Sequence, residues 1–264
     1  MIDKLFFDTV VIRHHEKLFT ERSILKSFKT SNRKKLIVKK RIEQIKNRIE
    51  QTALSCGRDP LSVNLVAVSK TVPSKNVRAA VEAGVFVFGE NYIQEAMKKI
   101  DEIDDNRLSW HFIGHLQSNK AKYVVRYFDL IHSVDTLKLA KEIDRQAKKL
   151  NKIQNILVQV NIAMEATKSG VSTKDTISLI KDISQLENLS VKGLMTLPPF
   201  FNQPEKVRPY FKTLARLKGQ IQQKPIKHIE INELSMGMTG DFEVAIEEGA
   251  TMVRIGTAIF GDRS

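Results

Sequence analysis

A lysine at the end of an apolar segment is the residue with the clearest chemical potential in this chain. Residues 64–71 read N-L-V-A-V-S-K-T, and the small and apolar residues before Lys70 are typical of a strand buried on both faces. An amine at the edge of such a strand is partly desolvated, which favours the neutral form that attacks a carbonyl group. Lys70 is therefore a candidate Schiff-base lysine, while a solvated charge that ends a strand remains the alternative.

Two loops near the C-terminus combine glycine with hydroxyl side chains. They read L-S-M-G-M-T-G-D at 234–241 and R-I-G-T at 254–257, and each precedes a helical segment whose N-terminal end favours negative charge. Either loop alone could be an ordinary turn, but two such loops opposite a strand-end lysine favour a phosphate site. A phosphate and an amine-reactive carbonyl describe pyridoxal 5′-phosphate (PLP), and they equally describe a phosphorylated sugar held by a Schiff-base aldolase.

Arg254 is the residue that distinguishes PLP from a phosphorylated sugar as the ligand. At the end of its strand, its guanidinium could face a pyridine nitrogen, and arginine has no proton to give because it stays protonated. A pyridine ring held in this way remains unprotonated and is a poor electron sink, so the site would hold PLP while catalysing carbanion chemistry weakly. A salt bridge at the rim is the alternative role for Arg254.

Short apolar strands alternate with amphipathic helices from residue 64 to the end of the chain. The strands are expected near 64–70, 85–88, 110–113, 130–133, 156–161, 191–197, 229–234 and 251–255. Strict alternation predicts parallel strands with right-handed crossovers, and eight such units predict an α/β fold, a single (β/α)8 TIM barrel. In that fold the loops at the C-terminal ends of the strands form the site. An open doubly wound sheet is the second choice, and no G-x-G-x-x-G follows the first strand to favour its dinucleotide-binding version.

Three local expectations accompany the barrel. Asp135 is expected to cap the helix after the fourth strand. One helix is expected within 204–220, with its start left open because Pro204 or Pro209 could occupy the first turn. His111 and His115 lie four apart on a strand and a turn, a spacing that does not align them for a metal, so we expect no metal site.

The N-terminal part of the chain differs from the rest. Residues 1–40 hold 11 Lys and Arg against 4 Asp and Glu, which gives +7 of the total net charge of +13. We divide the chain into a basic extension over 1–38, expected to be poorly ordered, and a barrel domain over 39–264 that begins with a helix over about 36–55. A basic arm for an acidic surface and a later translation start are alternatives for the extension.

Composition limits the classes of function. No apolar run approaches the roughly 20 residues that cross a bilayer, and charges interrupt the N-terminus where a secretory signal needs an apolar core. The single Cys56 cannot form an internal disulfide, which agrees with a reducing compartment. We therefore expect a cytoplasmic protein, a monomer without membrane association. The body of the chain lacks the basic stripe with aromatics that nucleic-acid binding requires.

The motifs together resemble a known family, the pyridoxal phosphate homeostasis proteins. The resemblance runs in order from about residue 40 to the end and leaves residues 1–38 outside. It rests on L-V-A-V-S-K-T (65–71), F-G-E-N-Y-I-Q-E (88–95), W-H-F-I-G-H-L-Q-S-N-K (110–120), H-S-V-D (132–135), K-S-G (168–170), G-L-M-T (193–196), L-S-M-G-M-T-G-D (234–241) and V-R-I-G-T-A-I-F-G (253–261).

This resemblance implies a fold-type III PLP barrel similar to the N-terminal domain of alanine racemase. By position, Lys70 would form the aldimine, Arg254 would approach the ring nitrogen and Asn91 would lie near the ring hydroxyl. The phosphate would contact Ser235, Gly237, Gly256 and Thr257. The family is regarded as a non-catalytic PLP carrier that acts in vitamin B6 and amino-acid homeostasis, with apo PLP-dependent enzymes as possible recipients.

A weak PLP-dependent racemase is the alternative function. Two-base racemisation needs a second acid/base group across the substrate from the lysine, which alanine racemases take from a tyrosine of a C-terminal β-domain. The four tyrosines of this chain are expected in helices or at their starts, where packing is their commoner role. The functions therefore rank as PLP carrier, weak PLP enzyme, phosphosugar lyase and basic-arm binding protein.

Overall fold

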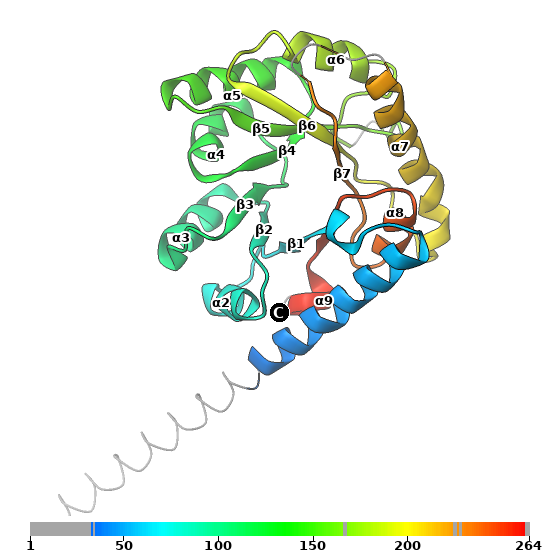
Figure 1. Ribbon diagram of the computed structural model, residues 1–264. Coiled ribbons are helices and arrows are strands. Elements are labelled where there is room, and N and C mark those ends of the chain that lie inside the picture. Colours follow the sequence, from blue (N-terminus) through cyan, green and yellow to red (C-terminus); the bar gives the residue numbers. More distant parts are fainter. Residues whose placement is uncertain (1–32, 34, 166–167, 224–225, 227–228, 262–264) are drawn as a thin grey trace, which may run out of the picture.

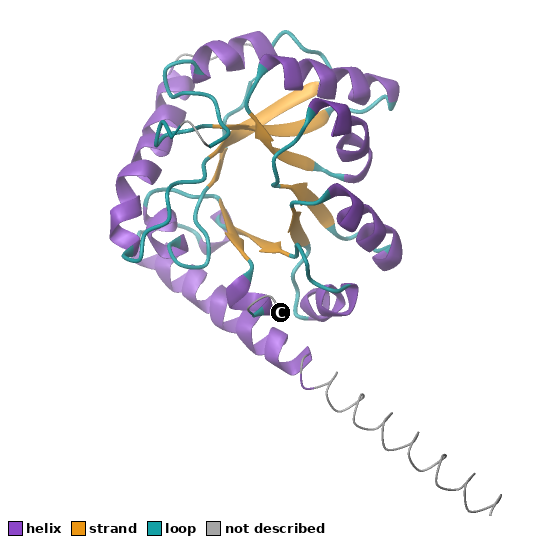
Figure 2. Cartoon of the chain, turned by 180° about the vertical axis from the view of Figure 1, so that it is seen from behind, coloured by secondary structure: helices purple, strands orange, loops and turns teal. Residues whose placement is uncertain are grey.

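Eight parallel strands close into a barrel in the computed structural model of the chain, which describes residues 33, 35–165, 168–223, 226 and 229–261. Each strand pairs with the next along the sequence, and β8 pairs with β1 to complete the ring (Figure 2). The strands are β1 (Asn64–Val68), β2 (Val87–Glu90), β3 (Ser109–Phe112), β4 (Leu130–Val134), β5 (Gln154–Gln159), β6 (Leu189–Met195), β7 (Glu233–Ser235) and β8 (Met252–Ile255). The predicted (β/α)8 TIM barrel is confirmed.

Helices follow the strands and form an outer layer around the barrel (Figure 1). The α-helices after β1 are α2 (Ser74–Glu82), α3 (Ile93–Ile103), α4 (Ala121–Tyr127), α5 (Leu137–Lys149), α6 (Thr176–Ile183), α7 (Arg208–Gln223), α8 (Phe242–Glu247) and α9 (Thr257–Phe260). Three short 3-10 turns are η1 (Pro60–Ser62), η2 (Ser118–Lys120) and η3 (Pro204–Val207). Both prolines of the expected 204–220 helix therefore lie in first turns, Pro204 in η3 and Pro209 in α7, where a missing N–H costs no hydrogen bond.

The interior of the barrel changes from apolar to polar along the strands. An apolar cluster of one side chain from each of five strands fills part of the barrel interior, and Val87 of β2 packs against it. The members of the cluster are Val66, Leu130, Leu157, Met195 and Met252. Because side chains alternate along a strand, the inward positions two residues further on hold His132 on β4, Gln159 on β5 and Arg254 on β8. The polar layer therefore lies above the apolar one, towards the C-terminal ends of the strands.

Two strands begin later than the sequence indicates. The expected 85–88 strand is observed as Val87–Glu90, because the N–H of Val85 donates to Ala80 O and closes the end of α2. The expected 229–234 strand is observed as Glu233–Ser235, paired with Gly193–Met195 of β6. At that point the backbones approach so closely that a Cβ on Gly193 would lie 2.0 Å from Glu233 O. Ile231 before it is buried in the core without belonging to a strand.

The N-terminal helix covers residues 35–55 and lies outside the seam between β1 and β8. Its Lys46 donates to the carbonyls of Ala83 and Gly84 at the end of α2, and its Arg48 pairs with Glu243 of α8. Figure 1 shows this helix running from α2 along α9 to α8. It includes the last residues of the expected 1–38 extension, and Val38 is buried. Residues 1–32 and 34 lie outside the described residues.

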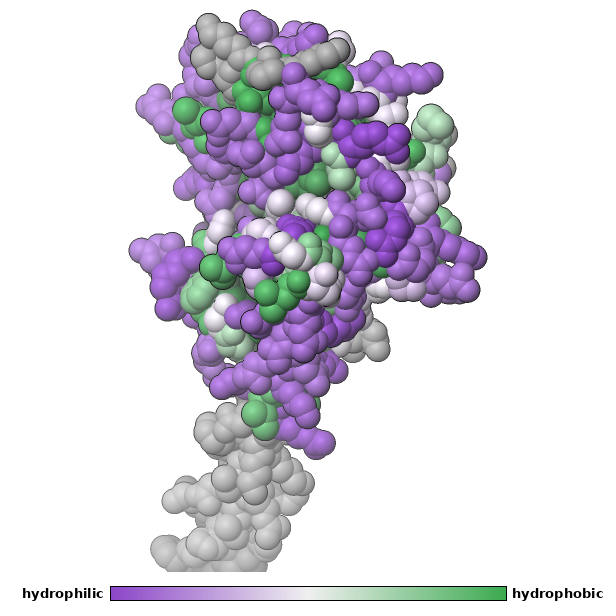
Figure 3. Space-filling view, turned by 45° about the vertical axis from the view of Figure 1, so that its right-hand side comes forward, coloured by the Kyte–Doolittle hydropathy of each residue, from purple (hydrophilic) through white to green (hydrophobic). Residues whose placement is uncertain are grey.

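Hydrophilic side chains predominate on the face drawn in Figure 3, and hydrophobic ones form only small scattered patches. Within the described ranges, none of the helices combines the length and the apolar character that crossing a bilayer requires.

Candidate functional site

Lys70 lies two residues beyond the end of β1, at the C-terminal mouth of the barrel, and is half-buried. The preceding Ser69 is turned to the helix side of the wall, where its hydroxyl donates to Glu90 Oε1 over 2.6 Å. β1 pairs with β2 on one side and β8 on the other. The chain therefore places Lys70 between the ends of the strands that carry Asn91 and Arg254.

Arg254 is the central polar side chain of the barrel interior. It is 3% exposed, donates from Nη1 to the Ser235 hydroxyl, and donates from Nη2 to Thr196 O over 2.9 Å. Burial lowers the pKa of Arg254 to about 10, and the charge of Asp241 opposes this shift. The guanidinium is thus still charged at neutral pH. It uses two of its five N–H groups in these contacts.

A pair of histidines extends this network across the barrel. His132 Nδ1 lies 2.9 Å from Ser235 Oγ, and His132 Nε2 lies 3.0 Å from His111 Nδ1. Burial lowers the pKa of His111 to about 4 and lowers that of His132 well below its ordinary value, with the charges of His111 and Arg254 adding to the shift at His132. Both imidazoles are therefore neutral at pH 7, which suits a site that already holds the buried charge of Arg254.

The loop after β7 contacts β8 through a backbone hydrogen bond. The N–H of Arg254 donates to Gly237 O over 3.0 Å, so the predicted phosphate residues of the first loop lie beside β8. Gly237 has φ +90°, and a Cβ there would lie 2.5 Å from the Cβ of Ala245. Gly256 precedes α9 and lies against β1, where an added Cβ would lie 3.3 Å from the Cβ of Val68, and Thr257 is exposed.

Asn91 carries a buried side-chain oxygen that is available to accept a hydrogen bond from a ligand. It follows Glu90, which faces α3, so the alternation along β2 turns Asn91 to the mouth. Its Oδ1 is buried and receives no hydrogen bond from any residue that the structure describes. A buried acceptor without a donor costs free energy unless something else supplies the hydrogen bond. A hydroxyl or N–H of a bound molecule would do so.

The structure thus brings together the predicted site residues in two groups. Ser235, Gly237 and Arg254 are joined by hydrogen bonds, while Lys70, Asn91 and Gly256 lie on the adjoining strand ends; Thr257 follows at the surface. The Ser235 hydroxyl, expected at a phosphate, contacts Arg254 and His132 inside the barrel.

Sequence reasoning missed His132 as a site residue. Its signal was available, because His132 lies two residues after Leu130 in a fully buried strand and so shares its inward face. His111 is likewise buried, whereas His115 is exposed and pairs with Ser169 over 3.1 Å. In the described part of the chain, no three or more His, Cys, Asp or Glu side chains are grouped to hold a metal ion.

Comparison with known proteins adds a family to this geometry. The alanine racemase N-terminal domain family matches residues 41–264. The pyridoxal phosphate homeostasis protein of Aquifex aeolicus is 44% identical over 223 residues, which cover 84% of this chain and 97% of that protein. The protein of the same name from Vibrio alginolyticus is 44% identical over 230 residues, which cover 86% and 97% of the two chains.

A solved structure agrees with these relatives. PipY of Synechococcus elongatus PCC7942, determined with PLP bound, superposes with a TM-score of 0.75 at 35% identity and covers 85% of this chain and 100% of its own. The similarity thus extends over the whole barrel and is not confined to one motif.

Proposed function

Because the chain belongs to the pyridoxal phosphate homeostasis protein family, we propose that it holds PLP at the mouth of its barrel, as a lysine aldimine, and acts in cofactor homeostasis. PLP is its cofactor, as in the bound PipY structure. The observation that carries the aldimine is the position of Lys70 between the strand ends of Asn91 and Arg254.

The residues present fit PLP in its separate parts. The ring hydroxyl of PLP could donate a hydrogen bond to the buried Asn91 Oδ1, which lacks a donor among the described residues. The Arg254 guanidinium could donate a hydrogen bond to the ring nitrogen. Gly237, Gly256 and Thr257 line the two adjoining loops proposed for the phosphate. Ser235 fixes Arg254 from within the barrel, and we assign it to the same site through that contact.

Lys70 supplies the covalent bond of the proposal. Its neutral amine adds to the aldehyde carbon, a C=N bond replaces the C=O bond, and the oxygen leaves as water. PLP, when bound, supplies an electron sink for carbanion chemistry. Arg254 keeps the ring nitrogen unprotonated because it has no proton to transfer, which weakens that sink and favours a carrier over an enzyme.

The wider role follows from this chemistry. A carrier that binds the aldehyde reversibly buffers the vitamin B6 pool, affects amino-acid pools through PLP-dependent enzymes, and can supply apo forms of those enzymes. We infer a monomer that acts in the cytoplasm, where these enzymes and their cofactor are found. Prompt exchange of the α-proton of a free amino acid at enzyme-like rates would favour the racemase alternative.

Absorption spectroscopy before and after borohydride tests the proposal. The purified protein should show the imine band, which borohydride removes, and peptide mass mapping should then find a pyridoxyl group on Lys70. Lys70→Ala should abolish both signals. Lys75→Ala is the matched control, since Lys75 is an exposed lysine of the neighbouring α2 and should leave both unchanged. Labelling of another lysine, or a colourless wild-type protein after incubation with PLP, would contradict the aldimine.

A further inference from the structure

A buried ion-pair network lies behind the turn that carries Lys70. Lys99 of α3 is 4% exposed, and its Nζ lies 2.5 Å from Oε1 of the fully buried Glu90 and 2.9 Å from Oε1 of Glu95. We call Lys99, Glu90 and Glu95 the Lys99 network. None of its members touches the barrel interior, because Glu90 is the outward-facing residue at the end of β2. The network belongs to the space between the barrel wall and the helices.

The Lys99 network bonds to the residues on both sides of Lys70. On the N-terminal side, Lys99 Nζ donates to Ser69 O over 2.6 Å, and the Ser69 hydroxyl donates to Glu90 Oε1 over 2.6 Å. On the C-terminal side, the N–H of Thr71 donates to Glu95 Oε1 over 2.6 Å. The backbone on either side of the Schiff-base lysine is thus held by charge-assisted hydrogen bonds, which are the stronger kind.

The conformation of the turn requires such support. Thr71 has φ +62°, a left-handed backbone conformation that costs a β-branched residue roughly 1–2 kcal/mol. Without the bond from Thr71 to Glu95, the turn would relax towards the ordinary region of φ and the Cα–Cβ direction of Lys70 would change. An imine forms only when the amine reaches the aldehyde carbon in the right geometry, so a small rotation of the turn affects that bond first.

The charges of the network suit positioning better than stabilisation. Buried ion pairs contribute little net stability, because the cost of removing both ions from water offsets their attraction. Burial raises the pKa of Glu90, and the charge of Lys99 opposes this rise. What the three side chains supply is a rigid set of oxygens and one ammonium group at fixed places along the turn.

We propose that Lys99, Glu90 and Glu95 are positioning residues that hold the 69–71 turn so that the Lys70 amine meets the aldehyde of PLP. The inference rests on the proposed function. It predicts that loss of Glu95, which lies on α3 and bonds to Thr71 and Lys99, affects the covalent step. Recognition of the ring and phosphate should stay unchanged, because those groups are assigned to Asn91, Arg254 and the loops after β7 and β8.

Glu95 gives the cleanest test, since its side chain is 31% exposed. It opens into a cavity of about 640 Å³ between α2 and α3, outside the barrel wall, so its removal leaves no void in the core. The test compares binding of PLP with binding of pyridoxine 5′-phosphate, which has the same ring and phosphate but an alcohol in place of the aldehyde. We expect Glu95→Ala to weaken PLP binding about tenfold, the loss of one charge-assisted hydrogen bond, while its affinity for pyridoxine 5′-phosphate stays that of the wild type.

Two further variants make the result specific. Glu95→Gln retains an oxygen for the Thr71 N–H and should recover most of the PLP affinity lost in Glu95→Ala. Lys99→Met combined with Glu90→Gln removes the buried charges together, so neither is left unpaired, and should weaken PLP binding selectively. Lys98→Ala changes the neighbouring lysine of α3, which is exposed and lines the same cavity, and should have no effect.

Equal loss of affinity for the two ligands in Glu95→Ala, or none for either, would overturn the positioning role. Failure of the proposed function is distinguishable, because the wild-type protein would then show no borohydride-sensitive imine on Lys70.

Discussion

The polar residues of the site depend on one another inside a closed apolar ring. Arg254 is buried and charged, and its partners are a hydroxyl, a carbonyl and, one step further, two histidines. Neutral imidazoles satisfy polar atoms there without adding repulsion to the guanidinium. The hydrogen-bond network of the site therefore depends on His111 and His132 being neutral.

Acid should destabilise the protein through His111. Its pKa is about 4 in the folded state, because it is buried, against 6.5 in its ordinary state. The unfolded state therefore binds more protons between these values, and stability is lost as pH falls from about 6.5 towards 4, by up to about 3 kcal/mol. Urea unfolding at pH 7 and pH 5 should show a smaller loss in His111→Gln than in the wild type. Other titrating groups, Glu90 among them, contribute to both proteins, so equal losses would contradict the prediction.

Gly237 should tolerate no side chain. Its φ of +90° and the 2.5 Å between an added Cβ and that of Ala245 predict that Gly237→Ala lowers stability by about 3 kcal/mol, from backbone strain and overpacking. Gly240→Ala is the control, because an added Cβ there meets no atom within 4 Å. Thermal unfolding should separate the two variants clearly. A shared, small shift would mean that the loop after β7 can move away.

At the level of single residues, the sequence was most informative about the candidate site where the type of a side chain and its place at a strand end suit one kind of chemistry. Lys70 and Arg254 could be proposed as site residues from their places at strand ends, and Asn91 only from the resemblance. The Lys99 network could not be predicted, because Glu90 and Lys99 come together only when α3 packs on the end of β2. Asp135 was expected to cap α5, and this was wrong. Thr136 caps that helix, while Asp135 accepts the N–H of Gly170 from the loop after β5, a distant contact with no local signal.

Backbone hydrogen bonds between neighbouring strands decide where each strand of the barrel begins and ends. The expected bounds agree closely with β1, β3, β4 and β8, and are displaced by two residues at β2, β5 and β6 and by more at the start of β7. At β2 and β7 the reason is that Val85 and Ile231 are buried in the core without belonging to a strand. Apolar composition reports burial, and backbone hydrogen bonds decide which buried residues form a strand. The order of the strands around the barrel could be predicted because parallel alternation leaves few other topologies.

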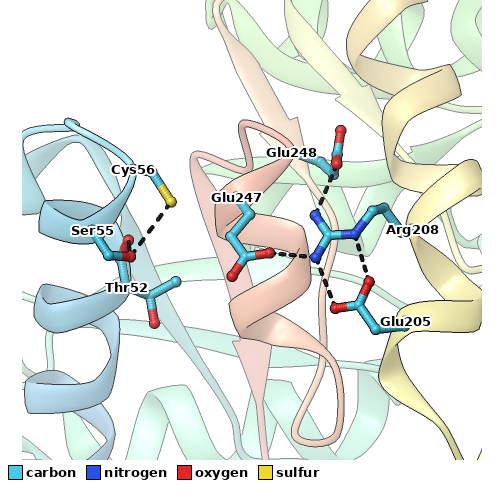
Figure 4. Close-up of polar contacts among 7 residues, drawn as sticks. All are labelled: Thr52, Ser55, Cys56, Glu205, Arg208, Glu247 and Glu248. Atoms are coloured by element: carbon cyan, nitrogen blue, oxygen red, sulfur yellow. Dashed lines mark hydrogen bonds and ion pairs between the residues drawn. The ribbon is translucent and has the colours of Figure 1, made fainter.

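Arg208 should fasten the start of α7 to α8. Figure 4 shows its guanidinium between Glu205 of η3 and the two acidic residues at the end of α8, Glu247 and Glu248. Because these groups are partly exposed, we expect Arg208→Ala to lower stability by only about 1 kcal/mol. The effect should shrink in high salt, which screens it. Arg216→Ala, at an exposed position of the same helix, serves as the control. Denaturant unfolding at low and high salt gives the comparison, and a salt-independent loss would indicate packing instead.

The whole molecule should unfold as one unit that includes the N-terminal helix. Ile42 of that helix is fully buried and belongs to the same apolar cluster as the outward side chains of the barrel. Ile42→Ala should therefore lower stability by about 3 kcal/mol. The midpoint measured by fluorescence of Trp110, the single tryptophan, on β3, should shift together with that measured by circular dichroism. Lys39→Ala, exposed on the same helix, should shift neither. Two separate transitions in Ile42→Ala would show that the helix unfolds independently.

Closure of the barrel between β1 and β8 has a consequence for how the protein is made. Lys70 leaves the ribosome well before Arg254 and Gly256. A nascent chain thus presents Lys70 before β8, the strand that pairs with β1, has been made. Under the proposed function, capture of PLP therefore requires that both β1 and β8 are present in the folded barrel.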